Sequence, residues 1–156
     1  VVYVEQSLFD GTGGALRAAQ PWICGERFLV ANGDDIYLKD DLERLCEAER
    51  GLLVFERFTK AEADVWQVDG DNRLTALTRV PAGKKANINC GAYVLGNEWF
   101  FTDLVLSPGK STEWSIPHAI PQLLDQQDYR AVQATVWFPC GTPEEIIVAE
   151  SVYSNP

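Results

Sequence analysis

A short apolar run followed directly by an acidic turn restricts the fold of this chain more than any other feature. The run Phe28-Leu29-Val30-Ala31 contains no polar residue, which is typical of a strand buried on both faces of a sheet. The polar stretch Asn32-Gly33-Asp34-Asp35 ends it. Because strands buried on both faces occur mainly in sheets that helices cover from both sides, we expect an α/β protein.

Other strand and helix patterns alternate around this run. The segment Gly11-Thr12-Gly13-Gly14 opens a helix to about residue 23, and Asp40-Asp41-Leu42 starts a second helix to about residue 50. A turn at 69–72 predicts a hairpin of strands 65–68 and 74–80. Further strands are expected at 1–4, 52–58, 87–95 and 131–138, and further helices at 97–106, 115–127 and 142–153. This order predicts a single domain over residues 1–156, with a Rossmann-like, mixed and mostly parallel sheet flanked by helices.

Charge and composition exclude several classes of function. The net charge of −10, from 13 basic and 23 acidic residues, argues against a non-specific nucleic-acid binder. The chain has neither an apolar run of about 20 residues nor a signal peptide, so we expect a cytoplasmic protein with no membrane partner. One histidine and four scattered cysteines argue against zinc sites and against Ser-His-Asp or Cys-His catalysis.

Three segments are expected at the carboxyl ends of strands, where open α/β sheets bind their ligands. Gly11 and Thr12 offer backbone N–H groups to an anion or a base edge, although a purely structural turn is the alternative. Asp34 follows the buried strand and suits Mg²⁺, unless it only caps or solvates a turn. Asn89 and Gly91 would allow contact with a sugar, or else mark a bulged strand.

Taken in order, these segments resemble the sugar-1-phosphate nucleotidyltransferase family over residues 2 to about 150. The motifs are Val-x-Tyr-Val-Glu-Gln, Gly-Thr-Gly-Gly-Ala-Leu, Phe-Leu-Val-x-Asn-Gly-Asp, Ile-Asn-x-Gly-x-Tyr-Val-Leu and Gly-Thr-Pro-Glu-Glu. Two of them look closest to members that act on mannose, heptose or related sugar phosphates. The resemblance implies a fold of the nucleotide-diphospho-sugar transferase type. It also implies attack of a sugar phosphate oxygen on the α-phosphate of a nucleoside triphosphate, giving an NDP-sugar and pyrophosphate.

The resemblance also assigns roles to individual residues. The candidates are Gln6, Gly11 and Thr12 for the nucleotide, Asp34 for Mg²⁺, with Asp35 as a weaker candidate, and Asn89 and Gly91 for the sugar. The implied partners are therefore a nucleotide and a sugar phosphate, and the implied cofactor is Mg²⁺. No catalytic residue is assigned.

The chain departs from the family pattern in three places. Nothing matches the amino-terminal phosphate-gripping loop with its Thr-Arg and Lys-Pro, so the chain corresponds to the carboxy-terminal two-thirds of such a domain. Pro139 stands where the family carries a second metal-binding aspartate. The stretch Arg79-Val80-Pro81 stands where the family often has Glu-Lys-Pro for the sugar phosphate.

Three functions stay open on this basis. The chain is part of an active nucleotidyltransferase that a missing segment completes, a non-catalytic nucleotide- or sugar-phosphate-binding relative, or an unrelated α/β domain. Pro139 and Val80 favour the second. A sheet without the amino-terminal strand would expose an edge, so we expect self-association or pairing with a chain that supplies this strand.

Overall fold

The computed structural model describes residues 1–153, and their contacts divide the chain into two compact units. The first unit comprises Val1–Phe28 and Leu95–Gln127, and the second comprises Leu29–Val94 and the chain from Asp128 onward. The helical elements are α1 (Gly11–Ala19), η1 (Gln20–Trp22), α2 (Lys39–Glu47), η2 (Asn97–Phe101), α3 (Ile116–Ala119), η3 (Ile120–Leu123) and α4 (Pro143–Tyr153). The strands are β1 (Arg27–Ala31), β2 (Asp35–Tyr37), β3 (Gly51–Phe58), β4 (Ala63–Val68), β5 (Leu74–Val80), β6 (Lys85–Gly96), β7 (Arg130–Gln133) and β8 (Trp137–Pro139).

The first unit is built from short helices around an aromatic and aliphatic core. Helix α1 packs against α3, and its amino-terminal loop is tied to the segment before α3 by backbone bonds. Arg17 of α1 donates to the carbonyl oxygen of Thr102 at 2.5 Å. The large buried side chains of this unit include Leu16, Trp99, Phe100, Ile116, Ile120 and Leu123.

The second unit contains the sheet, whose strands follow the order β5-β4-β6-β3-β7, with β1 also paired to β6. Strands β3 and β7 are parallel, whereas β3–β6, β4–β6 and β4–β5 are antiparallel. Strands β2 and β8 form a separate antiparallel pair. The predicted α/β fold with a mixed sheet and flanking helices is confirmed. Antiparallel pairs nevertheless outnumber the parallel one among the described pairs of known direction, because β6 returns antiparallel beside β3 and the β4–β5 hairpin is antiparallel beside β6.

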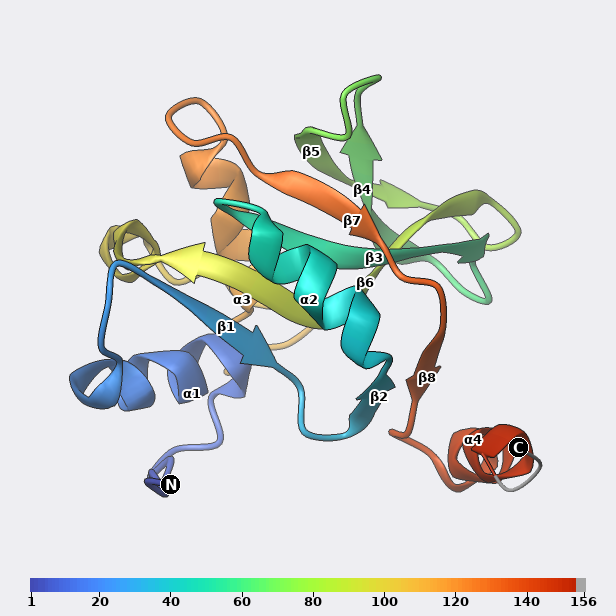
Figure 1. The fold of residues 1–156 in the computed structure, drawn as a ribbon, viewed down its shortest axis with the longest axis horizontal. Coiled ribbons are helices and arrows are strands. Elements are labelled where there is room, and N and C mark those ends of the chain that lie inside the picture. Colours follow the sequence, from blue (N-terminus) through green and yellow to red (C-terminus); the bar gives the residue numbers. More distant parts are fainter. Residues whose placement is uncertain (154–156) are drawn as a thin grey trace. The chain divides into compact units, whose positions relative to one another are not determined.

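Helix α2 covers one face of this sheet, packing on β3 and β7 (Figure 1). Leu45 of the helix is fully buried against Leu53, Cys90, Ala92 and Val94 of the strands and Ala134 just after β7. Asp41, on the first turn of α2, is also fully buried. Its carboxylate accepts hydrogen bonds from Thr135 N and Oγ1, both at 2.8 Å, and from Arg44 at 2.5 Å.

Several elements differ from the sequence-based expectation, each for a physical reason. The expected strand at 131–138 is interrupted, because Thr135 N and Val136 N donate to the Asp41 carboxylate instead of to a neighbouring strand. The expected helix at 115–127 is only α3 and η3, since Pro121 lacks the N–H that continuation of α3 would require.

Two further expectations were wrong near the aromatic core of the first unit and at the start of the chain. The expected helix at 97–106 is limited to η2, because Thr102 N and Oγ1 both donate to the Trp99 carbonyl and close the turn there. Residues 1–4 form no strand, since no described segment pairs with them.

Candidate functional site

The glycine-rich loop of the first unit opens α1 in a backbone conformation that only glycine adopts easily. Gly11 has φ +86°, and a Cβ placed on it would overlap the Trp114 carbonyl oxygen and lie 2.8 Å from the Trp114 nitrogen. The segment is held by bonds from Trp114 N to Asp10 O at 2.6 Å and from Gly13 N to Trp114 O at 2.9 Å. The loop is thus locked against the chain before α3.

The three residues predicted to bind the nucleotide line one pocket of about 330 Å³ in this unit. Gln6 donates through Nε2 to Asp10 Oδ1 at 2.5 Å and to Gly11 O at 3.1 Å, which leaves its side-chain oxygen available. The Thr12 hydroxyl accepts from Ile116 N at 3.2 Å. The N–H groups of Gly11 and Thr12 donate to no acceptor among residues 1–153, as expected in the first turn of a helix. This arrangement can present fixed donors to a polar base edge or an anion.

Replacing Gly11 by Ala is expected to destabilise the first unit by about 3 kcal/mol, from the left-handed φ and from the contact with Trp114. Gly109→Ala is the matched control, since Gly109 has φ +77° but nothing within 4 Å of its added Cβ. The control should lose about 1 kcal/mol, for the conformation alone. Urea unfolding measures both, and equal losses would contradict the locked geometry of the loop.

In the second unit, Asp34 lies between β1 and β2, and its carboxylate is exposed. Its backbone carbonyl accepts from Cys140 N at 2.9 Å, which fixes the residue beside the end of β8. The carboxylate itself has no hydrogen bond or ion pair to residues 1–153, so it can bind a cation without losing an internal partner. No group of three or more metal-ligating side chains gathers anywhere in the described chain.

Asp35, by contrast, is held within the protein. Its carboxylate accepts from Asn32 at 3.1 Å, Tyr37 at 3.2 Å and the Trp137 indole at 3.2 Å. Burial raises the pKa of this carboxyl, although the three hydrogen bonds act in the opposite direction. Because its oxygens are occupied, Asp35 suits the support of neighbouring residues better than metal binding.

The two predicted sugar-contact residues lie on β6 beside this network. Gly91 has φ +76°, and its carbonyl accepts from Asn32 N at 2.9 Å; a Cβ there would overlap the Asn32 amide. Asn89 donates to the Tyr93 hydroxyl at 2.6 Å and accepts from Gly91 N at 3.2 Å. One amide N–H and one lone pair of Asn89 remain for a ligand.

The two internal departures from the family motifs also have a clear structural context. Pro139 pairs with Asp35 across β2 and β8, so a position directly beside the Asp34 turn carries no side-chain ligand. Arg79 forms a two-pronged pair with Asp64, with both distances 3.0 Å, and a further contact to Glu62 at 3.5 Å. Its guanidinium is therefore already neutralised by carboxylates.

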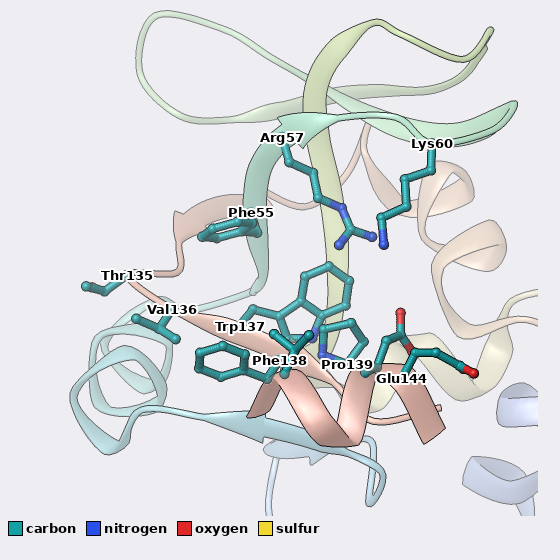
Figure 2. A pocket seen from close by; sticks show the side chains of 11 residues that line it. Phe55, Arg57, Lys60, Thr135, Val136, Trp137, Phe138, Pro139 and Glu144 are labelled. Atoms are coloured by element: carbon teal, nitrogen blue, oxygen red, sulfur yellow. The ribbon is translucent and has the colours of Figure 1, made fainter. Parts of the chain in front are cut away.

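A larger pocket of about 500 Å³ in the second unit was missed by sequence reasoning (Figure 2). It lies between β3, β8 and α4, and its aromatic centre is Trp137, with the Arg57 guanidinium 4.6 Å from the ring centroid. The alternation of Phe55 and Arg57 on one strand was the available signal, but the Trp137 contact depends on a distant part of the chain.

Comparison with known proteins finds similar sequences and similar structures. The chain is 29% identical to the bifunctional protein GlmU of Methanococcus aeolicus, covering 97% of this chain and 37% of that protein. It is 26% identical to a putative UTP–glucose-1-phosphate uridylyltransferase of Methanocaldococcus jannaschii, over 85% of this chain and 52% of that one. Its structure matches a UDP-glucose pyrophosphorylase solved with UDP-glucose, with a TM-score of 0.74 and 20% sequence identity. The match covers 98% of this chain and 65% of that one. No family model matches the chain.

The fold is thus that of the nucleotide-diphospho-sugar transferases. The resemblance of its motifs to the sugar-1-phosphate nucleotidyltransferases is supported by these relatives, which are 29% and 26% identical to the chain. An unrelated α/β domain is accordingly set aside. The chain spans about 37% of the length of the GlmU relative.

Proposed function

We propose that the protein containing this chain transfers a nucleotidyl group from a nucleoside triphosphate to a sugar 1-phosphate, giving an NDP-sugar and pyrophosphate. The observation that carries the proposal is the Gly11–Thr12 loop, whose free N–H donors and Gln6 side chain line a pocket in a fold shared with nucleotidyltransferases. In the proposed reaction, this loop and Gln6 hold the nucleotide. A phosphate-binding segment would complete the catalytic machinery, and catalytic residues remain to be found.

Asp34 is the proposed Mg²⁺ ligand, and Asn89 and Gly91 are the proposed sugar contacts. Mg²⁺ is commonly held by one or two carboxylates together with substrate phosphates, so one exposed carboxylate without an internal partner fits this ion. When bound, the ion would neutralise phosphate charge. The remaining hydrogen-bonding capacity of Asn89 suits a sugar hydroxyl, and Gly91 permits close approach because it has no side chain.

A non-catalytic nucleotide- or sugar-phosphate-binding relative is the second candidate. Two observations favour it: Pro139 offers no second metal ligand opposite Asp35, and Arg79 is already paired with Asp64. Such a protein would retain nucleotide binding and lack turnover.

Nucleotide binding is tested by titrating the protein calorimetrically with nucleoside triphosphates. Replacing Gln6 by Leu removes the polar end of the side chain at similar size, and we expect the affinity for the preferred nucleotide to fall about tenfold. Gln122→Leu, in the same unit but outside this pocket, is the matched control and should not change it. Equal affinities for the wild type and Gln6→Leu would show that the Gln6 side chain does not contact the nucleotide.

The compartment and the assembly of the protein are also proposals. No helix among residues 1–153 is long and apolar enough to cross a bilayer. The cytoplasmic location stays a prediction. Exposed apolar side chains support self-association or pairing with a chain that supplies a further strand; they include Tyr3, Leu8 and Phe9. Sedimentation velocity would measure this association.

A further inference from the structure

Asn32 is the only asparagine in the sequence that is followed by glycine. The Asn32–Gly33 pair lies in the turn between β1 and β2, and Gly33 is exposed (Figure 1). An asparagine before glycine is prone to intramolecular deamidation, because glycine has no side chain to keep its backbone nitrogen away from the preceding amide. The proposed transfer reaction does not use this pair.

The structure leaves the Gly33 nitrogen free to react. Its N–H donates to no acceptor among residues 1–153, whereas Asn32 N is bonded to Gly91 O at 2.9 Å. A Cβ built on Gly33 would meet nothing within 4 Å, and the φ of Gly33 lies outside the left-handed region. The fold therefore does not require a glycine at this position, and the space around its peptide group is open.

The Asn32 side chain connects two neighbouring segments. Its Nδ2 donates to Asp35 Oδ2 at 3.1 Å, and its amide lies against the backbone of Gly91, where a Cβ would overlap it. Asp35 also accepts from Tyr37 and Trp137, so the Asn32 amide is one of the groups that hold the turn to β2 and β8. A carboxylate in place of this amide would lose the donor and would bring a second negative charge next to Asp35.

We propose that Asn32 is a self-modification site, at which attack by the Gly33 nitrogen loosens the turn that presents Asp34. The bond between Gly33 N and Asn32 Cγ forms, the Asn32 Cγ–Nδ2 bond breaks, and Nδ2 leaves as ammonia with the proton of the Gly33 N–H. Water then opens the resulting succinimide and leaves an aspartate or an isoaspartate. An effect of this change on NDP-sugar formation rests on the proposed function, whereas the modification and the loosened turn do not.

The test is to incubate the full-length protein under mildly alkaline conditions, which favour attack by a peptide nitrogen, and to digest it with trypsin. Cleavage after Arg27 and Lys39 gives a peptide of residues 28–39 that contains no other side-chain amide, so a mass change from NH2 to OH is assigned to Asn32. We expect Asn32 to convert at least about tenfold faster than Asn72, an exposed asparagine of the same unit with no glycine after it.

Two variants connect this reaction to the fold. Gly33→Ala should slow the conversion at least about tenfold and should unfold at no lower a urea concentration than the wild type, because the added methyl group meets no atom. Asn32→Asp reproduces one product and should unfold at a lower urea concentration, whereas Asn72→Asp, the matched change of charge, should not.

Three results would each overturn the inference. They are conversion of Asn32 no faster than that of Asn72, an unchanged rate in Gly33→Ala, and a wild-type unfolding midpoint for Asn32→Asp. Because the readouts are peptide mass and stability, they decide the inference whether or not the protein forms an NDP-sugar.

Discussion

Replacing Asp34 by Asn is expected to lower the rate of NDP-sugar formation at least about 100-fold. The reason is that this exposed carboxylate is the proposed Mg²⁺ ligand, and the position beside it, Pro139, offers no substitute. The carboxylate makes no internal hydrogen bond, so the variant should unfold at the same urea concentration as the wild type. Steady-state kinetics at saturating Mg²⁺ and a urea titration measure the two effects.

The matched control for this prediction is Asp71→Asn, which changes an exposed aspartate in the turn between β4 and β5. It removes the same charge from the same unit and should retain the wild-type rate. If Asp34→Asn also kept the wild-type rate, or if both variants lost activity equally, Asp34 would not be the metal ligand.

Asp41→Asn should destabilise the second unit by about 3 kcal/mol at neutral pH. The buried carboxylate accepts from Thr135, Arg44 and Val136, and an amide cannot accept from all of these donors. Burial alone would raise the pKa of the Asp41 carboxyl, but the hydrogen bonds outweigh it and hold the pKa below its ordinary value of 3.8.

The lowered pKa gives this prediction a defined pH dependence. A carboxyl with a lowered pKa in the folded state contributes its full stability above the unfolded-state value, and that contribution is lost as the pH falls through the folded-state value. The difference between wild type and Asp41→Asn should therefore shrink below about pH 3.8. Asp40→Asn, exposed on the same turn, should change stability by no more than about 0.5 kcal/mol. A difference that stays constant down to low pH would contradict this account of Asp41.

Elements whose cause is local could be predicted from the sequence. The hairpin turn holds because Asp69 Oδ1 accepts from Asp71 N and Arg73 N, both at 2.9 Å, and Asn72 adopts φ 60°. Helix α4 begins where its cap predicts, with Glu145 N donating to Thr142 Oγ1 at 3.3 Å. Each of these depends on side chains within four residues, which a sequence pattern contains.

Features that depend on distant residues could not be predicted. The break between β7 and β8 results from Asp41, which is 94 residues from Thr135 in the sequence. The same holds for the candidate sites: local motifs predict roles for Gly11 and Asp34, whereas the supporting role of Asp35 requires Trp137, 102 residues away. The Arg57–Trp137 pocket could not be predicted, although Glu144 and Glu145 of the Gly-Thr-Pro-Glu-Glu motif line it, because it exists only once β3 and β8 are placed in the fold.

The most direct test of the central claim is product formation by the full-length protein encoded by the gene. The protein is incubated with Mg²⁺, the common nucleoside triphosphates and a panel of sugar 1-phosphates, and the products are followed by ³¹P NMR. The account predicts an NDP-sugar and pyrophosphate in equal amounts for at least one pair of substrates. Nucleotide binding without either product for any pair would contradict it, and would establish the protein as a non-catalytic relative of the nucleotidyltransferases.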